Sequence, residues 1–375
     1  MLSDNKKSVA TAPNSYNTFD TDNQSAFFPK VHNIIIENEL QCKFEPKKLL
    51  SEYLAYSYER LGLISRSNRV RMCGEFLEFG KFSSVGGGSP VGGPPPTGEL
   101  DYKFKLTNAN FCRDRLCPMC NWRRSYKIFG QVSKIMDFIV DDYEYLFLTL
   151  TVPNCIGSDL PALIDTMQHA FSKKFFRYKR IKQAVKGFFK ALEITRNKKN
   201  NTYHPHFHIV IAVPKGYFKS SCYIKRDEWL EMWQMAMNDY SITQVDIRKC
   251  RTKHELQEGS EASKALSSAI AEVAKYSVKS SDYLDVNDCV LTDEVVNVLL
   301  SALSNRRLCS FGGCFDEVRK KLNLDDVIDG DLLHLDDTLR SDVAEMIYKY
   351  QWSCGCYKLI EYKRNVPVIE VDEDF

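Results

Sequence analysis

Two strand-like runs joined by a short polar turn constrain this chain more than any other feature of its sequence. The first run, Gly187–Thr195, reads GFFKALEIT, and the second, His206–Val213, reads HFHIVIAV. The residues between them, RNKKNNTYHP, are polar and typical of turns. Because a connection this short joins strands that run in opposite directions, we expect an antiparallel hairpin here.

Further strands and helices flank this hairpin along the chain. We expect strands over Tyr145–Val152 and Ile242–Arg248, and helices over Leu160–Lys182 and Asp227–Asn238. This alternation of antiparallel strands with helices predicts an α+β fold, in which helices cover one face of a sheet.

Composition and charge limit where such a fold can act. The chain has 375 residues, enough for two or three domains, and a formal net charge of only +2. Any nucleic-acid surface must therefore come from local clusters of basic side chains. The sequence shows neither a long apolar run typical of a membrane span nor the apolar stretch of a signal peptide. We therefore expect a cytoplasmic protein whose 13 cysteines are thiols or metal ligands rather than disulfides.

The paired histidines at the start of the second strand are the sharpest chemical feature. Side chains alternate between the faces of a strand, so His206 and His208 point the same way and can bind one cation. Glu193, on the preceding strand, could supply a third ligand. Imidazoles with a carboxylate suit Mn²⁺, Mg²⁺ with water, or Zn²⁺. The alternative is a pair of structural histidines, and His204, in the turn, is expected outside the ligand set.

A cysteine cluster stands upstream, in the segment FCRDRLCPMCNWRRSYK. Cys117 and Cys120 have the C-x-x-C spacing of a metal knuckle, Cys112 precedes them, and Cys73 is a candidate fourth ligand. Four thiolates in tetrahedral geometry would form a structural zinc site. The alternative is a set of buried reduced thiols, and whether Cys73 belongs to the cluster is left open.

Basic side chains crowd the same segment beside Trp122 and Tyr126. Cations interleaved with stackable rings suit a nucleic-acid strand held in a groove, so we expect DNA contacts here. The residues concerned are Arg113, Arg115, Arg123, Arg124 and Lys127. A second basic run, Lys173–Lys182, also carries aromatic residues, but a solvated helix face explains it equally well.

Several of these segments together resemble a known family. HPHFHIVI is similar to the histidine motif of the HUH endonucleases, and most of all to that of the replication initiator (Rep) proteins of rolling-circle plasmids. FLTLTVPN resembles the first motif of that family, ALEIT its metal-ligand glutamate strand, and the cysteine segment a stretch upstream of its catalytic domain. The resemblance implies an HUH-like central antiparallel sheet with helices, a zinc-binding-like module and a helical C-terminal part.

The chain divides into four expected regions. Residues 1–45, rich in polar side chains, are expected to form a disordered arm, and residues 46–130 a Cys-rich DNA-binding module interrupted by the flexible loop Gly86–Gly98. The nicking domain would cover 131–285. A helical region with an acidic tail would complete the chain over 286–375.

A helix expected over Lys264–Lys279 offers the nucleophile that the resemblance implies. Glu272 and Tyr276 are four residues apart and Lys279 is three further on, so a helix would place all three on one face. In the family that the chain resembles, this tyrosine attacks the DNA phosphorus, and the glutamate activates water for a terminating hydrolysis. Lys279 would help to hold the phosphate or favour the phenolate. Tyr283 is a rival nucleophile that lacks the preceding glutamate.

The function that the resemblance implies is initiation of plasmid rolling-circle replication. A transesterification that depends on Mg²⁺ or Mn²⁺ would nick single-stranded DNA at the double-strand origin, leaving the 5′ phosphate on Tyr276 and a 3′ hydroxyl as primer. A host helicase and DNA polymerase are the implied partners, and no membrane is involved. Alternatives are a transposase or relaxase of the same superfamily, or a non-catalytic zinc-containing DNA-binding regulator.

Overall fold

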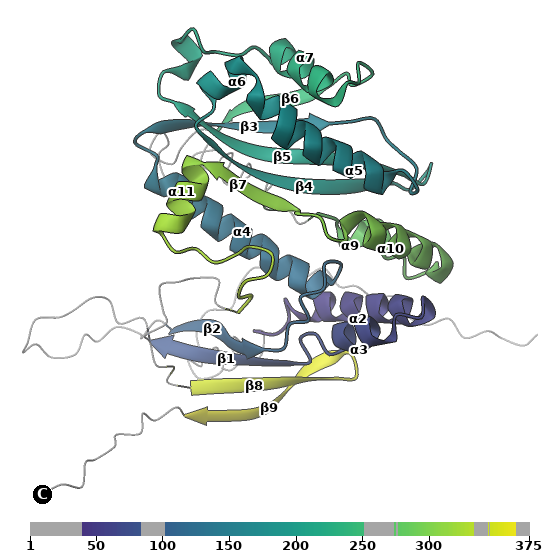
Figure 1. Cartoon of the computed structure of the whole chain (residues 1–375). Coiled ribbons are helices and arrows are strands. Elements are labelled where there is room, and N and C mark those ends of the chain that lie inside the picture. The colour runs from purple at the N-terminus through teal and green to yellow at the C-terminus, as the bar shows by residue number, and fades with distance from the viewer. Residues whose placement is uncertain are drawn as a thin grey trace, which may run out of the picture. The chain divides into compact units, whose positions relative to one another are not determined.

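Two antiparallel sheets organise the residues that the computed structural model describes, which are 40–83, 102–250, 274, 277–333, 344 and 346–364. One sheet has five strands in the order β6-β3-β5-β4-β7, and the other has four in the order β2-β1-β8-β9 (Figure 1). Every neighbouring pair of strands in both sheets is antiparallel. Together with the helices, this confirms the predicted α+β fold.

The predicted hairpin forms the centre of the five-stranded sheet. It consists of β4 (Gly187–Asn197) and β5 (Thr202–Pro214), and β3 (Tyr143–Thr151) pairs with the other side of β5. The edges are β6 (Val245–Cys250) and β7 (Cys309–Gly313). The sheet therefore takes one strand from beyond residue 285, the predicted end of this region, because β7 pairs with β4 across a long stretch of sequence.

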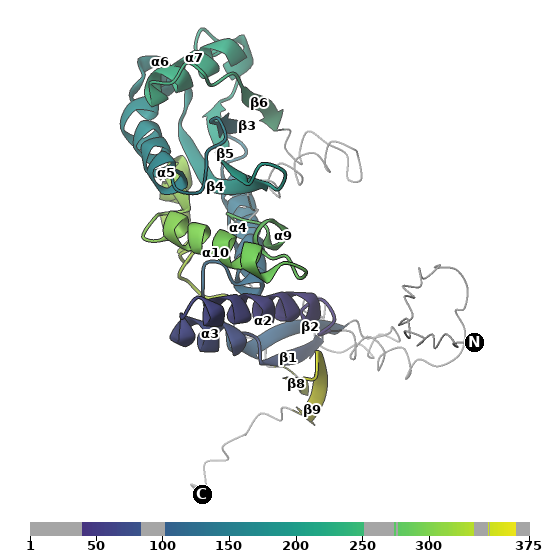
Figure 2. The same cartoon turned by 90° about the vertical axis from the view of Figure 1, so that its right-hand side faces the viewer.

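One face of this sheet carries helices that come from the connections between its strands. Phe207 of β5 points into this layer, where its ring contacts Phe171, and Phe175 contacts Trp233. Buried aromatic rings of this size dominate the energetics of such a layer. Figure 2 shows α5 (Leu160–His169), α6 (Lys179–Ala184) and α7 (Arg226–Met237) on the same side of the sheet. The short turns η1 (Ala170–Lys174) and η2 (Phe175–Arg177) connect α5 to α6.

Helices also cover part of the opposite face, so the prediction that only one face is covered is wrong. Tyr145 of β3 points away from the aromatic layer, because side chains alternate along a strand. Its hydroxyl donates a hydrogen bond of 2.7 Å to the Met136 carbonyl in α4 (Pro118–Phe138). Its ring packs against Phe315 in α11 (Cys314–Lys321), which lies too far along the chain for a local pattern to reveal the contact.

The four-stranded sheet joins segments from distant parts of the chain. β1 (Phe76–Ser83) pairs with β2 (Tyr102–Ala109) on one side and with β8 (Met346–Ser353) on the other. β8 forms a hairpin with β9 (Cys356–Arg364). The residues of the predicted Cys-rich module, 46–130, therefore share a sheet with residues near the C-terminus.

Further helices accompany the two sheets, and packed residues before the first of them fall within the predicted arm. Phe44 is buried and its ring contacts both Phe79 and Trp122, so the predicted disordered arm over 1–45 does not extend through Leu40–Phe44. The remaining elements are α2 (Glu45–Arg60), α3 (Ile64–Arg71), the short turn η3 (Tyr217–Lys219), α9 (Ser280–Tyr283) and α10 (Cys289–Leu303).

The prediction of a helical region over 286–375 is only partly right. It holds for α10 and α11, but β7, β8 and β9 are strands. Tyr348 and Tyr350 are buried and alternate with more exposed polar residues, which is the period-two pattern of a strand. Cys354 and Gly355, between β8 and β9, have positive φ angles of 52° and 84°, as a two-residue hairpin turn requires.

Some predictions fall outside the described residues. These are the arm over 1–39, the loop Gly86–Gly98, residues 264–273 and 275–276 of the expected helix, and residues 334–343, 345 and 365–375 of the expected C-terminal region. Within the described part of the chain, no helix combines the length and the apolar character needed to cross a lipid bilayer.

Candidate active site and metal centres

Glu193, His206 and His208 come together on one face of the β4–β5 hairpin. Glu193 and His206 are direct partners across the two strands, and His208, two residues along β5, points to the same face. All three residues are buried, with exposed fractions of 3%, 8% and 7%. Phe207, between the histidines, packs into the aromatic layer on the other face and so fixes which way the imidazoles point. The register of the hairpin thus assembles the predicted ligand set.

The distances between these side chains suit a single ion. Nε2 of His208 lies 2.8 Å from Glu193 Oε2, Nε2 of His206 lies 3.4 Å from the same oxygen, and the two nitrogens are 3.1 Å apart. Ligands bound to one ion at about 2.1 Å are separated by about 3.0 Å in octahedral and about 3.4 Å in tetrahedral geometry. A carboxylate with two imidazoles is a donor set that divalent ions bind. The residues therefore fit the predicted metal.

Hydrogen bonds orient both imidazole rings. Nδ1 of His206 lies 3.1 Å from the carbonyl oxygen of His204, so it donates there and Nε2 is directed towards Glu193. Nδ1 of His208 lies 3.2 Å from the hydroxyl of Thr149 in β3. Such partners fix the tautomer and direction of metal-binding histidines. The sequence reasoning missed Thr149, although its place opposite His208 follows from the pairing of β3 with β5.

Charges around Glu193 favour its ionised form. Burial by itself raises the pKa of the Glu193 carboxyl, but the hydrogen bonds and charges of His206 and His208 outweigh burial and hold that pKa well below its usual range. Lys279 Nζ lies 3.7 Å from Glu193 Oε1 and adds a further positive charge. The Lys279 side chain is about half exposed, at 52%, so a ligand in solvent can also reach it.

The segment before α9 is attached to the sheet beside Glu193. The Ile194 N–H donates a hydrogen bond of 2.7 Å to the Ser277 carbonyl. Lys279 has extended backbone angles and precedes α9. The helix expected over 264–279 therefore does not include Ser277–Lys279, because the Ser277 carbonyl bonds to β4 instead of continuing a helical turn. Lys279 therefore does not reach Glu193 by the helical spacing that the sequence predicted. Glu272 and Tyr276, the other two residues of that prediction, lie outside the described residues.

Two residues of α9 bear on the candidate site. Tyr283, the rival nucleophile, is 2% exposed, and its hydroxyl donates to the Leu116 carbonyl, so its role is structural. Asp282 is a carboxylate that the sequence reasoning missed, since no motif marks it. Burial raises its pKa, the Lys279 charge lowers it, and the Glu193 charge raises it, which places Asp282 within electrostatic reach of the ligand cluster.

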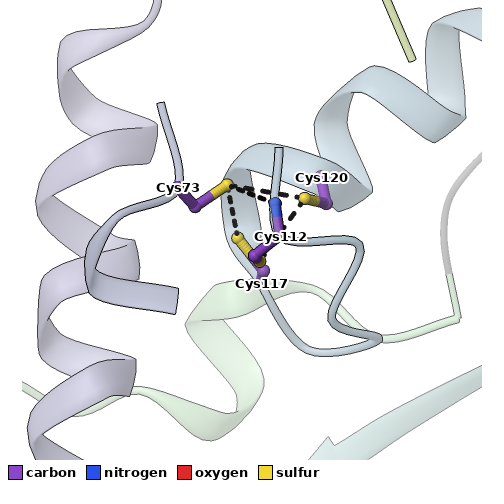
Figure 3. Close-up of side chains that lie close together, drawn as sticks. All are labelled: Cys73, Cys112, Cys117 and Cys120. Atoms are coloured by element: carbon purple, nitrogen blue, oxygen red, sulfur yellow. Dashed lines mark hydrogen bonds between the residues drawn. The ribbon is translucent and has the colours of Figure 1, made fainter. Parts of the chain in front are cut away.

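The four predicted cysteines converge at the start of α4, and Cys73 is one of them (Figure 3). Cys73 Sγ lies 3.5 Å from both Cys117 Sγ and Cys120 Sγ, and the sulfurs of Cys112 and Cys120 are 3.7 Å apart. Four sulfurs at about 2.3 Å from a zinc ion would be about 3.8 Å apart in a tetrahedron. A disulfide would need about 2.05 Å. The geometry therefore fits a four-thiolate metal site.

Hydrogen-bond donors surround these sulfurs. Three consecutive backbone N–H groups, of residues 112–114, donate to cluster sulfurs at distances of 3.4, 3.2 and 3.4 Å. Such donors offset the negative charge of thiolates and fix the ligand positions. The Ser51 hydroxyl also lies 3.4 Å from Cys117 Sγ, but it donates its proton to the Lys47 carbonyl at 2.8 Å. Three of the four cysteines are buried and Cys112 is half-buried, as in a closed structural site.

The predicted DNA contacts of Arg123, Arg124 and Lys127 are wrong in this structure. All three are buried in α4, and each donates to the loop over residues 325–333. Arg123 bonds to the carbonyls of that loop's last two residues, Arg124 to one carbonyl, and Lys127 to a carbonyl and to the Asp325 carboxylate at 2.8 Å. This segment thus occupies the donors of basic side chains that appear free in the sequence, and its Asp325 carboxylate forms an ion pair with Lys127.

Arg113 and Arg115 are placed differently. Arg113 is exposed and donates at 3.2 Å to the Asp329 carbonyl, whereas the half-buried Arg115 donates to the carbonyls of Leu303 and Arg306. These two side chains remain at the surface of the cysteine segment, so their predicted DNA contacts stay predictions.

Several known proteins are similar in sequence to this chain. The Rep_1 family, described as replication protein, matches residues 103–358. A protein named Protein rep from a Bacillus species is 39% identical over 271 residues, which cover 69% of this chain and 86% of the relative. Proteins of the same name from Bacillus amyloliquefaciens and Streptococcus pneumoniae are 38% and 35% identical, covering 77% and 78% of this chain and 83% of each relative. No solved structure matches the chain. The chain therefore belongs to the Rep_1 family of replication proteins, which confirms the resemblance to plasmid replication initiators.

Proposed function

We propose that this protein starts rolling-circle replication of a plasmid by nicking one DNA strand at the double-strand origin. Glu193, His206 and His208 would hold Mg²⁺ or Mn²⁺, and Tyr276 would be the nucleophile. The observation that carries the proposal is the cluster of one buried carboxylate and two oriented imidazoles, whose ligand atoms lie within 4.8 Å of one another. This cluster occurs in a chain of the replication-protein family, and a nicking centre would serve the start of replication.

The contacts of the residues after Tyr276 in the sequence support its role. The Ser277 carbonyl accepts a hydrogen bond of 2.7 Å from the N–H of Ile194, the residue next to Glu193. Lys279 Nζ lies 3.7 Å from the Glu193 carboxylate. A phenol one residue from such an anchor would have a short distance to cover to a phosphate at the ligand cluster, since successive Cα atoms are about 3.8 Å apart.

In the proposed reaction the Tyr276 oxygen attacks the phosphorus of the scissile phosphodiester. A bond forms between that oxygen and phosphorus, and the bond from phosphorus to the 3′ oxygen of the preceding nucleotide breaks. The phenol proton passes to water, and the departing oxygen takes a proton to become the 3′ hydroxyl primer. Lys279 would hold the phosphate by charge, and a divalent ion, when bound, would stabilise negative charge on the phosphate oxygens.

Other residues would complete the cycle and the fold. Glu272 would take a proton from a water molecule at the second cleavage, so that this cleavage ends in hydrolysis instead of a second adduct. The four cysteines would hold a structural Zn²⁺ that keeps α4 attached to the residues after α3. In the cytoplasm, a host helicase would separate the strands and a host DNA polymerase would extend the primer.

The variant Tyr276→Phe tests the proposal because it removes the nucleophilic oxygen and little else. We expect loss of both nicking and the covalent protein–DNA adduct on a labelled single strand from the plasmid's own origin with Mn²⁺, while origin binding is retained. Tyr283→Phe is the matched control, since the Tyr283 hydroxyl already donates to the Leu116 carbonyl. Nicking that persists in Tyr276→Phe would refute the proposal, and wild-type binding without any nicking would favour a non-catalytic regulator.

A further inference from the structure

A pocket lined with arginines lies beside the cysteine cluster. Its volume is about 250 Å³. Residues from the end of α10 contribute to its wall, including the buried apolar side chains Leu299 and Leu303. Its charged members are Arg66, Arg69, Arg113, Asp114 and Arg115. Four guanidinium groups against one carboxylate give the lining a net charge of +3, in a chain whose total is only +2.

Asp114 organises two of these arginines. Its carboxylate is buried and accepts hydrogen bonds from the Tyr58 hydroxyl at 2.8 Å and from the Leu116 N–H at 2.9 Å. Its other oxygen lies 3.0 Å from Arg66 Nε and 3.6 Å from an Arg69 terminal nitrogen. The side chains of Arg66 and Arg69 are nevertheless 40% and 56% exposed, so both keep donors directed to solvent.

The cysteine cluster fixes the third arginine. Arg113 has a positive φ of 60°, which costs a non-glycine residue roughly 1 kcal/mol or more. The backbone keeps this conformation because the Arg113 N–H donates at 3.2 Å to Cys120 Sγ. Arg115 is less available, since it is half-buried and donates to two carbonyls, of Leu303 at the end of α10 and of Arg306, whereas the exposed Arg113 donates to one, of Asp329. These bonds also satisfy carbonyls that would otherwise repel an anion.

We propose that this arginine pocket, which shares no residue with the proposed nicking centre, binds a phosphodiester group of the DNA backbone. Guanidinium groups pair with phosphate oxygens through two parallel N–H donors, which suits Arg66, Arg69 and Arg113. The contact carries no base information, so it would position origin DNA on the protein rather than select its sequence. This inference rests on the proposed function only in taking DNA as the ligand.

Salt-dependent DNA binding tests the pocket directly. The double variant Arg66→Gln/Arg69→Gln should bind a labelled duplex from the origin and an unrelated duplex about 10-fold more weakly, by the same factor for both. The dependence of the logarithm of the binding constant on the logarithm of salt concentration should become shallower by about 1. Arg71→Gln is the matched control, because Arg71 lies at the end of the same helix but pairs with Glu59 outside the pocket. It should bind DNA as the wild type does.

A second variant covers the case in which the double variant fails to fold, since it would leave Asp114 buried without its partners. Arg113→Gln leaves both Asp114 ion pairs in place and should weaken binding and lower the salt slope in the same direction. Unchanged binding and slope in whichever of these variants folds would overturn the pocket proposal. Adduct formation on a pre-melted single strand reports separately on the nicking centre. A wild-type protein that binds with the expected slope but forms no adduct would overturn the proposed function and leave the pocket standing.

Discussion

The two ligand clusters of this protein are assembled in opposite ways. Glu193, His206 and His208 come from one hairpin, and the pairing of its two strands is enough to bring them together. The cysteines come from segments that are far apart, since Cys73 and Cys112 are separated by 39 residues and a strand pair. Three protein ligands leave coordination positions for water or substrate, whereas four thiolates close the site. The difference separates a centre suited to chemistry from one suited to holding a fold.

The surroundings of the two clusters differ too, because the hairpin cluster is more accessible than the cysteine cluster. The hairpin cluster has a half-exposed lysine beside it and a chain segment attached at Ser277. The cysteine cluster is enclosed by backbone N–H donors and by the Ser51 hydroxyl. We therefore expect variants of the first cluster to lose activity at nearly constant stability, and variants of the second to lose stability first.

Removing one cysteine should have the largest effect. Cys117→Ser places a hydroxyl at a fully buried ligand position, and structural zinc contributes on the order of 10 kcal/mol to the folding of small zinc domains. We expect loss of bound zinc and of the cooperative thermal unfolding transition, measured by metal analysis and circular dichroism. Cys222→Ser, at a half-buried cysteine outside the cluster, should unfold as the wild type does. A Cys117→Ser protein of unchanged zinc content and midpoint would contradict the assignment.

Removing one imidazole should affect catalysis instead. His208→Ala deletes a ligand whose Nε2 lies 2.8 Å from Glu193 Oε2, and metal ions supply several kcal/mol of charge stabilisation. We expect nicking of an origin single strand to fall by about 1,000-fold, with zinc content and unfolding midpoint near those of the wild type. His169→Ala, at an exposed histidine of α5, is the control. Equal loss of stability in the His208 and Cys117 variants would erase the contrast between the clusters.

Removing the hydroxyl that orients His208 should have a smaller effect. Thr149→Val keeps the shape of the side chain but deletes the group 3.2 Å from His208 Nδ1. Loss of such a partner lowers metal affinity by about 10- to 100-fold. The Mn²⁺ concentration for half-maximal nicking should rise by that factor, while the rate at saturating Mn²⁺ recovers. An unchanged Mn²⁺ requirement would show that Thr149 does not orient the ring.

Lys190 offers a buried charge on the other face of β4, and its variant should change stability rather than activity. Burial lowers its pKa from the usual 10.5 to about 7, and its ammonium lies 4.2 Å from the centre of the Phe207 ring. Below pH 7 both the folded and the unfolded chain carry this proton, so the cost of burying the charge is fully present. Between pH 7 and 10.5 the unfolded chain binds more protons, so this group makes the free energy of unfolding rise with pH, by up to about 1.4 kcal/mol per unit.

Lys190→Met removes that dependence. The variant should be more stable than the wild type at pH 6, and its advantage should shrink steadily towards pH 9 in urea unfolding. An advantage that stays constant over this range would show that Lys190 does not titrate as its burial requires.

The sequence predicted best those features that depend on residues close together in the chain. The hairpin, its antiparallel pairing and the convergence of Glu193 with both histidines follow from a short turn and a period of two. The cysteine knuckle was also readable, because Cys112, Cys117 and Cys120 are close in sequence, whereas Cys73 had no spacing to fix it. Thr149 could have been found by writing out the register of β3 against β5.

The errors concern partners that are distant in sequence. Arg124 and Lys127 have the pattern of a DNA-binding helix, but their partners lie about 200 residues later, in an acidic loop. The strands β8 and β9 did carry a signal, since Tyr348 and Tyr350 alternate with polar residues before a glycine turn. The end of the expected helix at Lys279 could not be foreseen, because a hydrogen bond from Ile194 to Ser277 determines it.

The most direct test of the central claim is to map the covalent adduct by mass spectrometry after incubation with an origin single strand, with Mn²⁺ or with a chelator. The account predicts a nucleotide-linked peptide that contains Tyr276, present with Mn²⁺, absent with the chelator and absent in His208→Ala. An adduct on another residue, or one that forms equally well without the metal or without His208, would contradict it.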